Sequence, residues 1–163
     1  MPKLTAFVAA CALMVAAATA NAANMSALTS SESQLATAAN TPYPIKLTGD
    51  PAESYKIDGS KVIVLRAGNY YLNAASQIGG NTTGDVYIWM RLNGKDVPDS
   101  NSIQTVPIKG FTAVLVAQTG ISLKKGDVIE FVYAASVPGL GLIATAPKNM
   151  PAVPSIIFSI LEL

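Results

Sequence analysis

The stretch "GDVYIWMRLNGKDVPDS", residues 84–100, decides the fold class. Residues 86–92 are largely apolar, and successive side chains of an extended strand point to opposite faces. One face carries Val86, Ile88, Met90 and Leu92, and the other carries Tyr87, Trp89 and Arg91. Asn93-Gly94 then ends the run with a dipeptide typical of tight hairpin turns. The stretch therefore predicts a β-strand whose two faces both need cover.

The same organisation extends through most of the chain. Short β-rich runs alternate with Gly, Pro, Asn and Asp about every 8–12 residues, which is typical of an all-β sandwich or barrel. The expected strands cover residues 43–47, 61–65, 69–78, 86–92, 103–108, 112–121, 128–136, 140–144 and 155–163. Gly68 and Gly94 mark expected turns with positive φ. No run after residue 22 has the length and period of a helix.

Composition argues against several classes of function. Charged residues make up 13% of the 163 residues, whereas soluble domains have about 25%. The formal net charge is +1, so no strong field would attract nucleic acid or an anionic membrane. There is no histidine, and Cys11 is the one cysteine. We therefore expect no enzyme and predict no catalytic, cofactor-binding or metal-binding residues.

The amino terminus divides into two expected segments. Residues 1–22 combine Lys3, an apolar stretch and the small-residue end Ala20-Asn21-Ala22, which is the pattern of a secretory signal peptide cleaved after Ala22. The same alanine-rich segment could instead form an uncleaved helical arm. It is short for a membrane span, so we expect none in the mature chain. Residues 23–40 are expected to be a linker with a first short strand near residues 33–38, followed by one domain over 41–163.

Residues 155–163 repeat the two-faced pattern. Ile156, Phe158 and Ile160 share one face, whereas Ile157 and Leu161 lie on the other. A sandwich covers only the inner faces of its sheets, so two such strands favour burial against neighbouring subunits. The predicted interface residues are Tyr87, Trp89, Arg91, Ile157 and Leu161. Cover by a loop of the same chain is the alternative.

Two residues of this set allow more than one interpretation. Arg91 could pair across a subunit seam with Asp85 or Glu130, or it could rest its stem on Tyr87 and Trp89 in a structural role, which we favour. Trp89 is expected to be a packing residue and not a platform for sugar stacking, because its neighbours are apolar.

Four segments together resemble a known superfamily. They are "AGNYYLNAASQI", "GDVYIWMRLNGKDVPDSNSIQTV", "SLKKGDVIEFVYAAS" and "PAVPSIIFSIL". In this order they resemble the TNF-like and complement-head jelly rolls. The Trp-Xaa-Arg-Xaa-Asn-Gly core, the Pro-Ser closing strand and the Thr41-Pro42 segment are most similar to stand-alone virion proteins of tailed bacteriophages. The resemblance covers about residues 28–163.

The resemblance implies a jelly-roll sandwich of about ten antiparallel strands that forms a homotrimer and acts by binding. The implied function is a non-enzymatic phage virion protein at the virion surface: a capsid decoration, fibre-tip or adhesion module. Its partners would be its own copies and other virion proteins or a host-surface ligand. No cofactor is implied, and no acidic loop suits the calcium that complement heads often bind. Because virion proteins need no leader, a secreted or periplasmic bacterial binding protein is the alternative.

Overall fold

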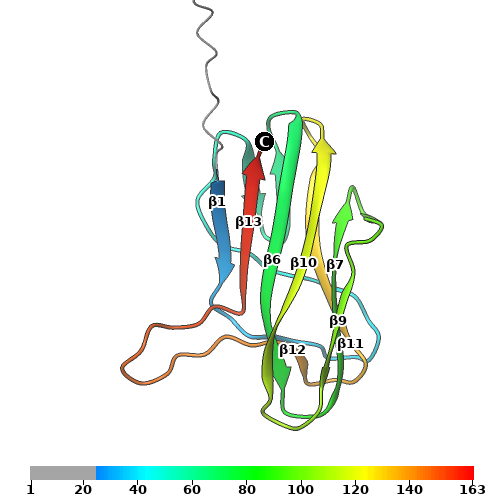
Figure 1. The fold of residues 1–163 in the computed structure, drawn as a ribbon, viewed down its shortest axis with the longest axis vertical. Helices are drawn as coiled ribbons and strands as arrows, with labels where there is room; N and C mark the ends of the chain where they lie inside the picture. Colours follow the sequence, from blue (N-terminus) through cyan, green and yellow to red (C-terminus); the bar gives the residue numbers. More distant parts are fainter. Residues whose placement is uncertain (1–24) are drawn as a thin grey trace, which may run out of the picture.

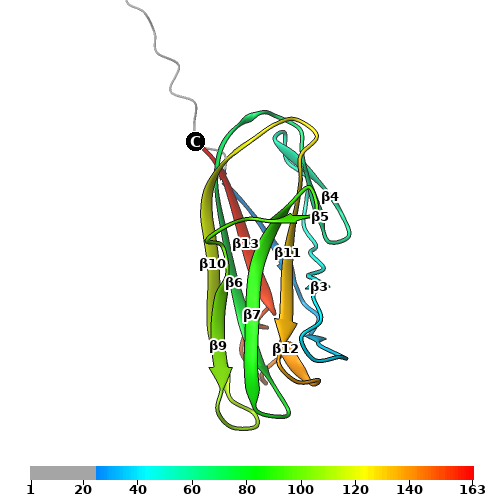
Figure 2. The same ribbon diagram turned by 90° about the vertical axis from the view of Figure 1, so that its right-hand side faces the viewer.

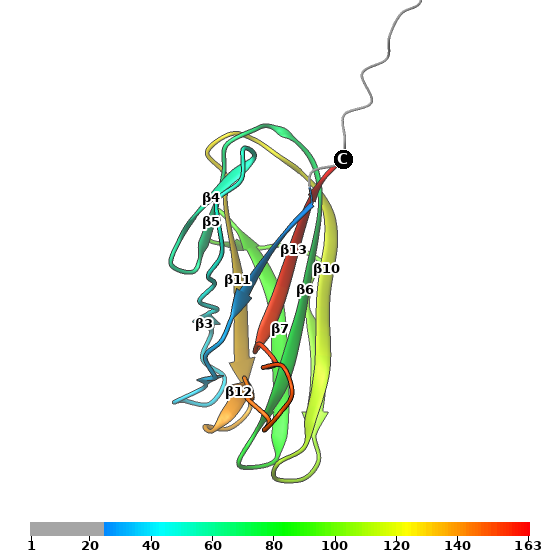
Figure 3. The ribbon, with the colours of Figure 1, turned by 90° about the vertical axis from the view of Figure 1, so that its left-hand side faces the viewer.

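The computed structural model describes residues 25–163, which form two antiparallel β-sheets packed face to face (Figure 1). Sheet A contains β1 (Met25–Ser30), β2 (Gln34–Leu35), β6 (Gly68–Gly80), β10 (Thr112–Leu123), β12 (Leu140–Leu142) and β13 (Ile156–Glu162). Sheet B contains β3 (Tyr43–Pro44), β4 (Tyr55–Asp58), β5 (Lys61–Val64), β7 (Gly84–Leu92), β8 (Lys95–Asp96), β9 (Ser102–Val106) and β11 (Val128–Ala135). Figures 2 and 3 show the two layers from the sides, with β6 and β10 in one layer and β5 and β11 in the other.

The long strands β6 and β7 organise the two sheets. Strand β6 lies between β13 and β10, and β7 lies between β11 and β9. The long strands β6, β7 and β10 belong alternately to sheet A, sheet B and sheet A. The chain therefore crosses the sandwich between β6 and β7 and again between β9 and β10. This confirms the predicted all-β jelly roll. Residues 25–163 contain thirteen strand segments where about ten were expected, because several are only two residues long.

The core forms where the inward faces meet. Val86, Ile88 and Met90 of β7 are fully buried, as the alternation in the sequence predicted. Phe131 of β11 and Phe158 of β13 join the two sheets, with ring centroids 4.5 Å apart. Dense packing of such apolar and aromatic side chains is the main force that holds the sheets together.

The segment predicted to be a linker contains a strand of the sandwich. Strand β1 pairs with β13 in the register Leu28 to Phe158, and Leu28 is fully buried. Apart from the exposed Met25, its other residues are small or polar, so composition alone resembled a linker. The expected strand near residues 33–38 is reduced to β2, and β4 was not predicted. The predicted signal peptide or arm, residues 1–22, lies outside the described residues.

The turns agree with the sequence at Gly94 but not at Gly68. Asn93 and Gly94 have φ of 52° and 78°, as expected for a tight hairpin turn between β7 and β8. Gly68 instead begins β6, pairs with Leu123, and is absent from the positive-φ residues of the described chain. Within residues 25–163, no helix has the length and apolar character needed to cross a membrane.

Candidate interaction surfaces

The outer surface of sheet A is uncharged across four neighbouring strands. We call it the sheet A face, and it consists of the outward side chains Met25, Ala27, Thr29, Tyr71, Asn73, Ala75, Gln77, Val114, Val116, Gln118, Ile157, Ser159 and Leu161. The register aligns them in rows, one of which is Thr29, Ile157, Ala75 and Val116. Figure 1 shows β1, β13, β6 and β10 side by side in this order. The strands of sheet B, in contrast, present no surface of comparable extent that lacks Asp, Glu, Lys and Arg.

Apolar side chains on the sheet A face are exposed in the single chain. Val114 is 65% exposed, Val116 39% and Ile157 44%. Scattered exposed apolar residues are normal, but Val116 of β10 and Ile157 of β13 flank Ala75 of β6 in one row, and Val114 lies next to them on β10. The arrangement is therefore a contiguous apolar surface suited to protein contact.

The centre of the sheet A face has one buried polar atom that lacks a hydrogen bond among the described residues. Asn73 lies in the row between Ser159 and Gln118, and its Oδ1 is buried without a partner among the described residues. The Gln118 Oε1 accepts a hydrogen bond of 2.7 Å from the Tyr71 hydroxyl. An unsatisfied amide oxygen in an apolar surface costs stability, so Asn73 would gain from a donor on a second molecule.

The outer surface of sheet B has a different character around β7. The Trp89 Nε1 and the Arg91 Nε each donate a 2.7 Å hydrogen bond to the Asp96 Oδ1. The Arg91 Cζ lies 5.5 Å from the centroid of the Trp89 ring. The hydrogen bond from Arg91, followed by that from Trp89, lowers the pKa of Asp96 below its ordinary value.

Arg91 thus has a partner in its own chain. Neither acid considered from the sequence is that partner, since Asp85 accepts a hydrogen bond from Thr105 and Glu130 accepts one from Ser60. The short hairpin between β7 and β8 brings Asp96 opposite Arg91. This agrees with a structural role for Arg91, whose side chain lies on Trp89.

The five predicted interface residues fall on opposite sides of the sandwich. Ile157 and Leu161 belong to the sheet A face, whereas Tyr87, Trp89 and Arg91 point outward from sheet B. Their role in a subunit interface stays a prediction. Sequence reasoning missed Val114 and Val116. The signal was present, because residues 112–121 also have apolar side chains on both faces.

Residues 25–163 hold no group of three or more Asp, Glu, Cys or His side chains placed to bind a metal ion.

Comparison with solved structures assigns the architecture. A crystal structure of murine APRIL at pH 5.0 matches with a TM-score of 0.62 and 13% identity, over 87% of this chain and 100% of that chain. Murine APRIL at pH 8.0 and at pH 8.5 gives TM-scores of 0.60 and 0.59, at 13% and 12% identity with the same coverage. APRIL is a member of the TNF family.

The fold is a TNF-like jelly roll.

Sequence comparison adds nothing to this structural result. No protein-family model and no curated protein sequence matches the chain. At 13% identity the likeness to APRIL concerns the fold alone. Any function of this TNF-like jelly roll has to be argued from its own surfaces.

Proposed function

We propose that this chain is a non-enzymatic structural protein of a bacteriophage virion and that it works as a homotrimer. The observation that carries the proposal is the uncharged, partly apolar sheet A face. A surface of this kind is costly to leave in water, and burial against identical copies removes the cost. The trimer would serve as a capsid decoration, fibre-tip or adhesion module at the virion surface.

Burial of the apolar side chains on the sheet A face would favour assembly. Each square ångström of apolar surface removed from water contributes roughly 25 cal/mol. Val114 and Val116 of β10 and Ile157 of β13 offer exposed apolar area on both sides of β6, and the Asn73 Oδ1 of β6 offers an acceptor without a partner among the described residues. We place Ile157 and Leu161 of the predicted interface here.

The phage assignment rests on the resemblance of the sequence. The residues that carry the pattern Trp-Xaa-Arg-Xaa-Asn-Gly form one local unit, in which Asp96 holds Trp89 and Arg91 after the turn at Asn93 and Gly94. This unit gives a structural reason for the pattern. The partners beyond its own copies would be other virion proteins or a ligand on the host surface.

A secreted or periplasmic bacterial binding protein is the second candidate. The signal-like residues 1–22 favour it, because a virion protein that assembles in the cytoplasm needs no leader. Mass spectrometry of the amino terminus separates the two candidates. An intact start at Met1 on protein from purified particles supports the virion protein, and a mature start at Ala23 supports secretion.

The assembly part of the proposal is tested with two matched charge substitutions. Val116→Glu places a carboxylate among the exposed apolar residues of β10 on the sheet A face, whereas Ile103→Glu places one on an exposed residue of β9 in sheet B. Light scattering across a dilution series should show that V116E weakens the trimer by at least about tenfold, since an unpaired buried charge is costly. I103E should behave like the parent. Equal trimers in both variants, or dissociation by I103E alone, would refute this choice of face.

A further inference from the structure

A small cleft opens beside the aromatic side chains on the outer surface of sheet B. Tyr87 and Trp89 of β7 form its aromatic wall, and its other lining residues are Asn40, Pro42, Asp96, Asn101 and Ala134. Its volume is ≈ 300 Å³, which is at the lower end of the range for small-molecule sites. The cleft lies on the opposite sheet from the proposed subunit interface.

The aromatic wall is held in a fixed position. The indole N–H of Trp89 is already bonded to Asp96, so the ring can offer only its apolar surface to a ligand. Arg91 packs on the Trp89 ring and is bonded to the same carboxylate oxygen. A side chain that is held before binding loses little entropy when a ligand arrives.

The one charged residue in the cleft lining, Asp96, is paired with Arg91. The Arg91 Nε and the Asp96 Oδ1 lie 2.7 Å apart, and the hydrogen bond from Arg91 lowers the pKa of Asp96 below its ordinary value. The remaining groups that line the cleft are uncharged. This balance favours a neutral ligand over an anion or a cation.

Unused hydrogen-bonding groups lie around the aromatic wall. Asn40 and Asn101 both line the cleft, and neither side-chain amide has a hydrogen bond within residues 25–163. Each amide supplies one acceptor and two donors. The sequence predicted packing for Trp89 and no sugar platform, because its neighbours along the strand are apolar, but the fold brings Asn40 and Asn101 from other segments into the same cleft. A rigid aromatic surface with free amides nearby matches a sugar ring, whose C–H face packs on the aromatic group while its hydroxyls bond to the amides.

We propose that the cleft formed by Tyr87, Trp89, Asn40 and Asn101 binds a neutral saccharide of one or two rings. The aromatic side chains hold the apolar face of a sugar ring, and the two amides bind its hydroxyls. The site lies within one subunit, so the inference depends neither on the trimer nor on the phage assignment.

Trp89 is the only tryptophan, so its fluorescence reports directly on the cleft. The full chain is titrated with glucose, galactose, N-acetylglucosamine and the disaccharides of each, with calorimetry in parallel. We expect at least one of these sugars to give a saturable change in Trp89 emission. No saturable change with any sugar of the panel overturns the proposal.

Variants then locate the binding. Trp89→Ala, followed by calorimetry, should weaken binding by about tenfold or more, because it removes the central aromatic surface. Asn101→Ala changes only an exposed loop residue, so it should keep the fold and still weaken binding several-fold. The control Tyr71→Ala, on the sheet A face, should bind like the parent. Binding that is unchanged by W89A and N101A overturns the proposal.

The same variants separate this site from a subunit interface. If Trp89 faces a sugar, W89A keeps the oligomer mass of the parent at every dilution. If W89A instead dissociates on dilution, Trp89 belongs to the interface predicted from the sequence and the saccharide proposal fails.

Discussion

Asp96 shows how one exposed side chain can organise its surroundings without adding much stability. Its ion pair with Arg91 is open to water, since 64% of the Asp96 side chain is exposed. Such pairs contribute about 0–1 kcal/mol. The effect of Asp96 is therefore orientation, because it holds the Trp89 ring and the Arg91 head at the same carboxylate oxygen. The sequence contained these residues, but nothing in it indicated that the hairpin would join them.

Gly94 is expected to be sensitive to any β-branched substitution. Its φ is 78°, and no atom lies within 4 Å of the position that a Cβ would occupy, so the cost is purely conformational. Gly94→Val should lower the free energy of unfolding by more than about 1 kcal/mol, as measured by chemical denaturation.

The matched control for this change is Gly120→Val. Gly120 is an exposed strand residue outside the positive-φ set, and it also has open space around it. Valine suits an extended strand, so this variant should be as stable as the parent or more stable. Equal losses in both variants would reject a conformational requirement at Gly94.

Tyr133 makes the fold sensitive to alkaline pH. The ring is buried and stacks on Tyr43 with centroids 5.5 Å apart, and burial raises its pKa to about 12. The unfolded chain releases this proton at its ordinary value of 10.0, whereas the folded chain keeps it. The stabilising contribution is therefore complete below pH 10 and is lost as the pH rises from 10 towards 12.

Tyr133→Phe should remove this part of the alkaline loss. The variant is compared with the parent by thermal unfolding at several values between pH 9 and pH 12. The difference in melting temperature should change in favour of Y133F as the pH rises. A constant difference over this range would show that Tyr133 does not titrate differently in the two states.

At the scale of the elements, the sequence was informative where residues alternate strongly and uninformative where side chains are small. The alternation over residues 69–78 and 86–92 predicted β6, β7 and their core faces. Strand β1 was not predicted because Leu28 is its only large buried residue, and because its position depends on pairing with β13, which is distant in the sequence. Residues far apart in the chain meet through such pairings, so a single sequence cannot reveal them. For the same reason it could not place Trp89 and Ile157 on opposite faces.

Strand β1 should contribute to stability as a core element. Leu28 is fully buried and pairs opposite Phe158, so Leu28→Ala should lower the free energy of unfolding by about 2–5 kcal/mol. Met25 of the same strand is largely exposed, and Met25→Ala serves as the control with little expected effect. Chemical denaturation measures both. A negligible loss for L28A would mean that residues 25–30 behave as the linker expected from composition.

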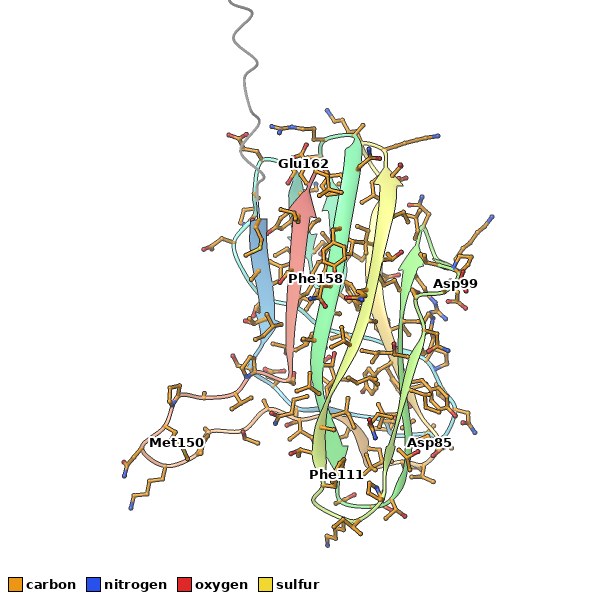
Figure 4. The ribbon with its side chains drawn as sticks, in the orientation of Figure 1. Asp85, Asp99, Phe111, Met150, Phe158 and Glu162 are labelled. Carbon is orange, nitrogen blue, oxygen red and sulfur yellow. The ribbon has the colours of Figure 1, made fainter. Side chains whose placement is uncertain are left out.

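At the scale of the whole molecule, the two outer surfaces favour different partners. The sheet A face lacks charge and exposes apolar side chains on adjacent strands, whereas sheet B presents charged groups and the aromatic cleft. A jelly roll of this design can bury one sheet in an assembly and leave the other free for a ligand. The long connection between β12 and β13 projects from the sandwich with Met150 near its tip, and it would lie outside both surfaces (Figure 4).

The mass of the protein in solution tests the central claim most directly. The chain, without added metal, is measured by light scattering over a dilution series from micromolar to nanomolar concentration. We expect a mass equal to three chains at micromolar concentration. If the trimer dissociates at lower concentration, it should give monomers without a dimer between, whether or not these monomers stay folded. A monodisperse monomer at micromolar concentration would contradict the proposed self-assembly through the sheet A face.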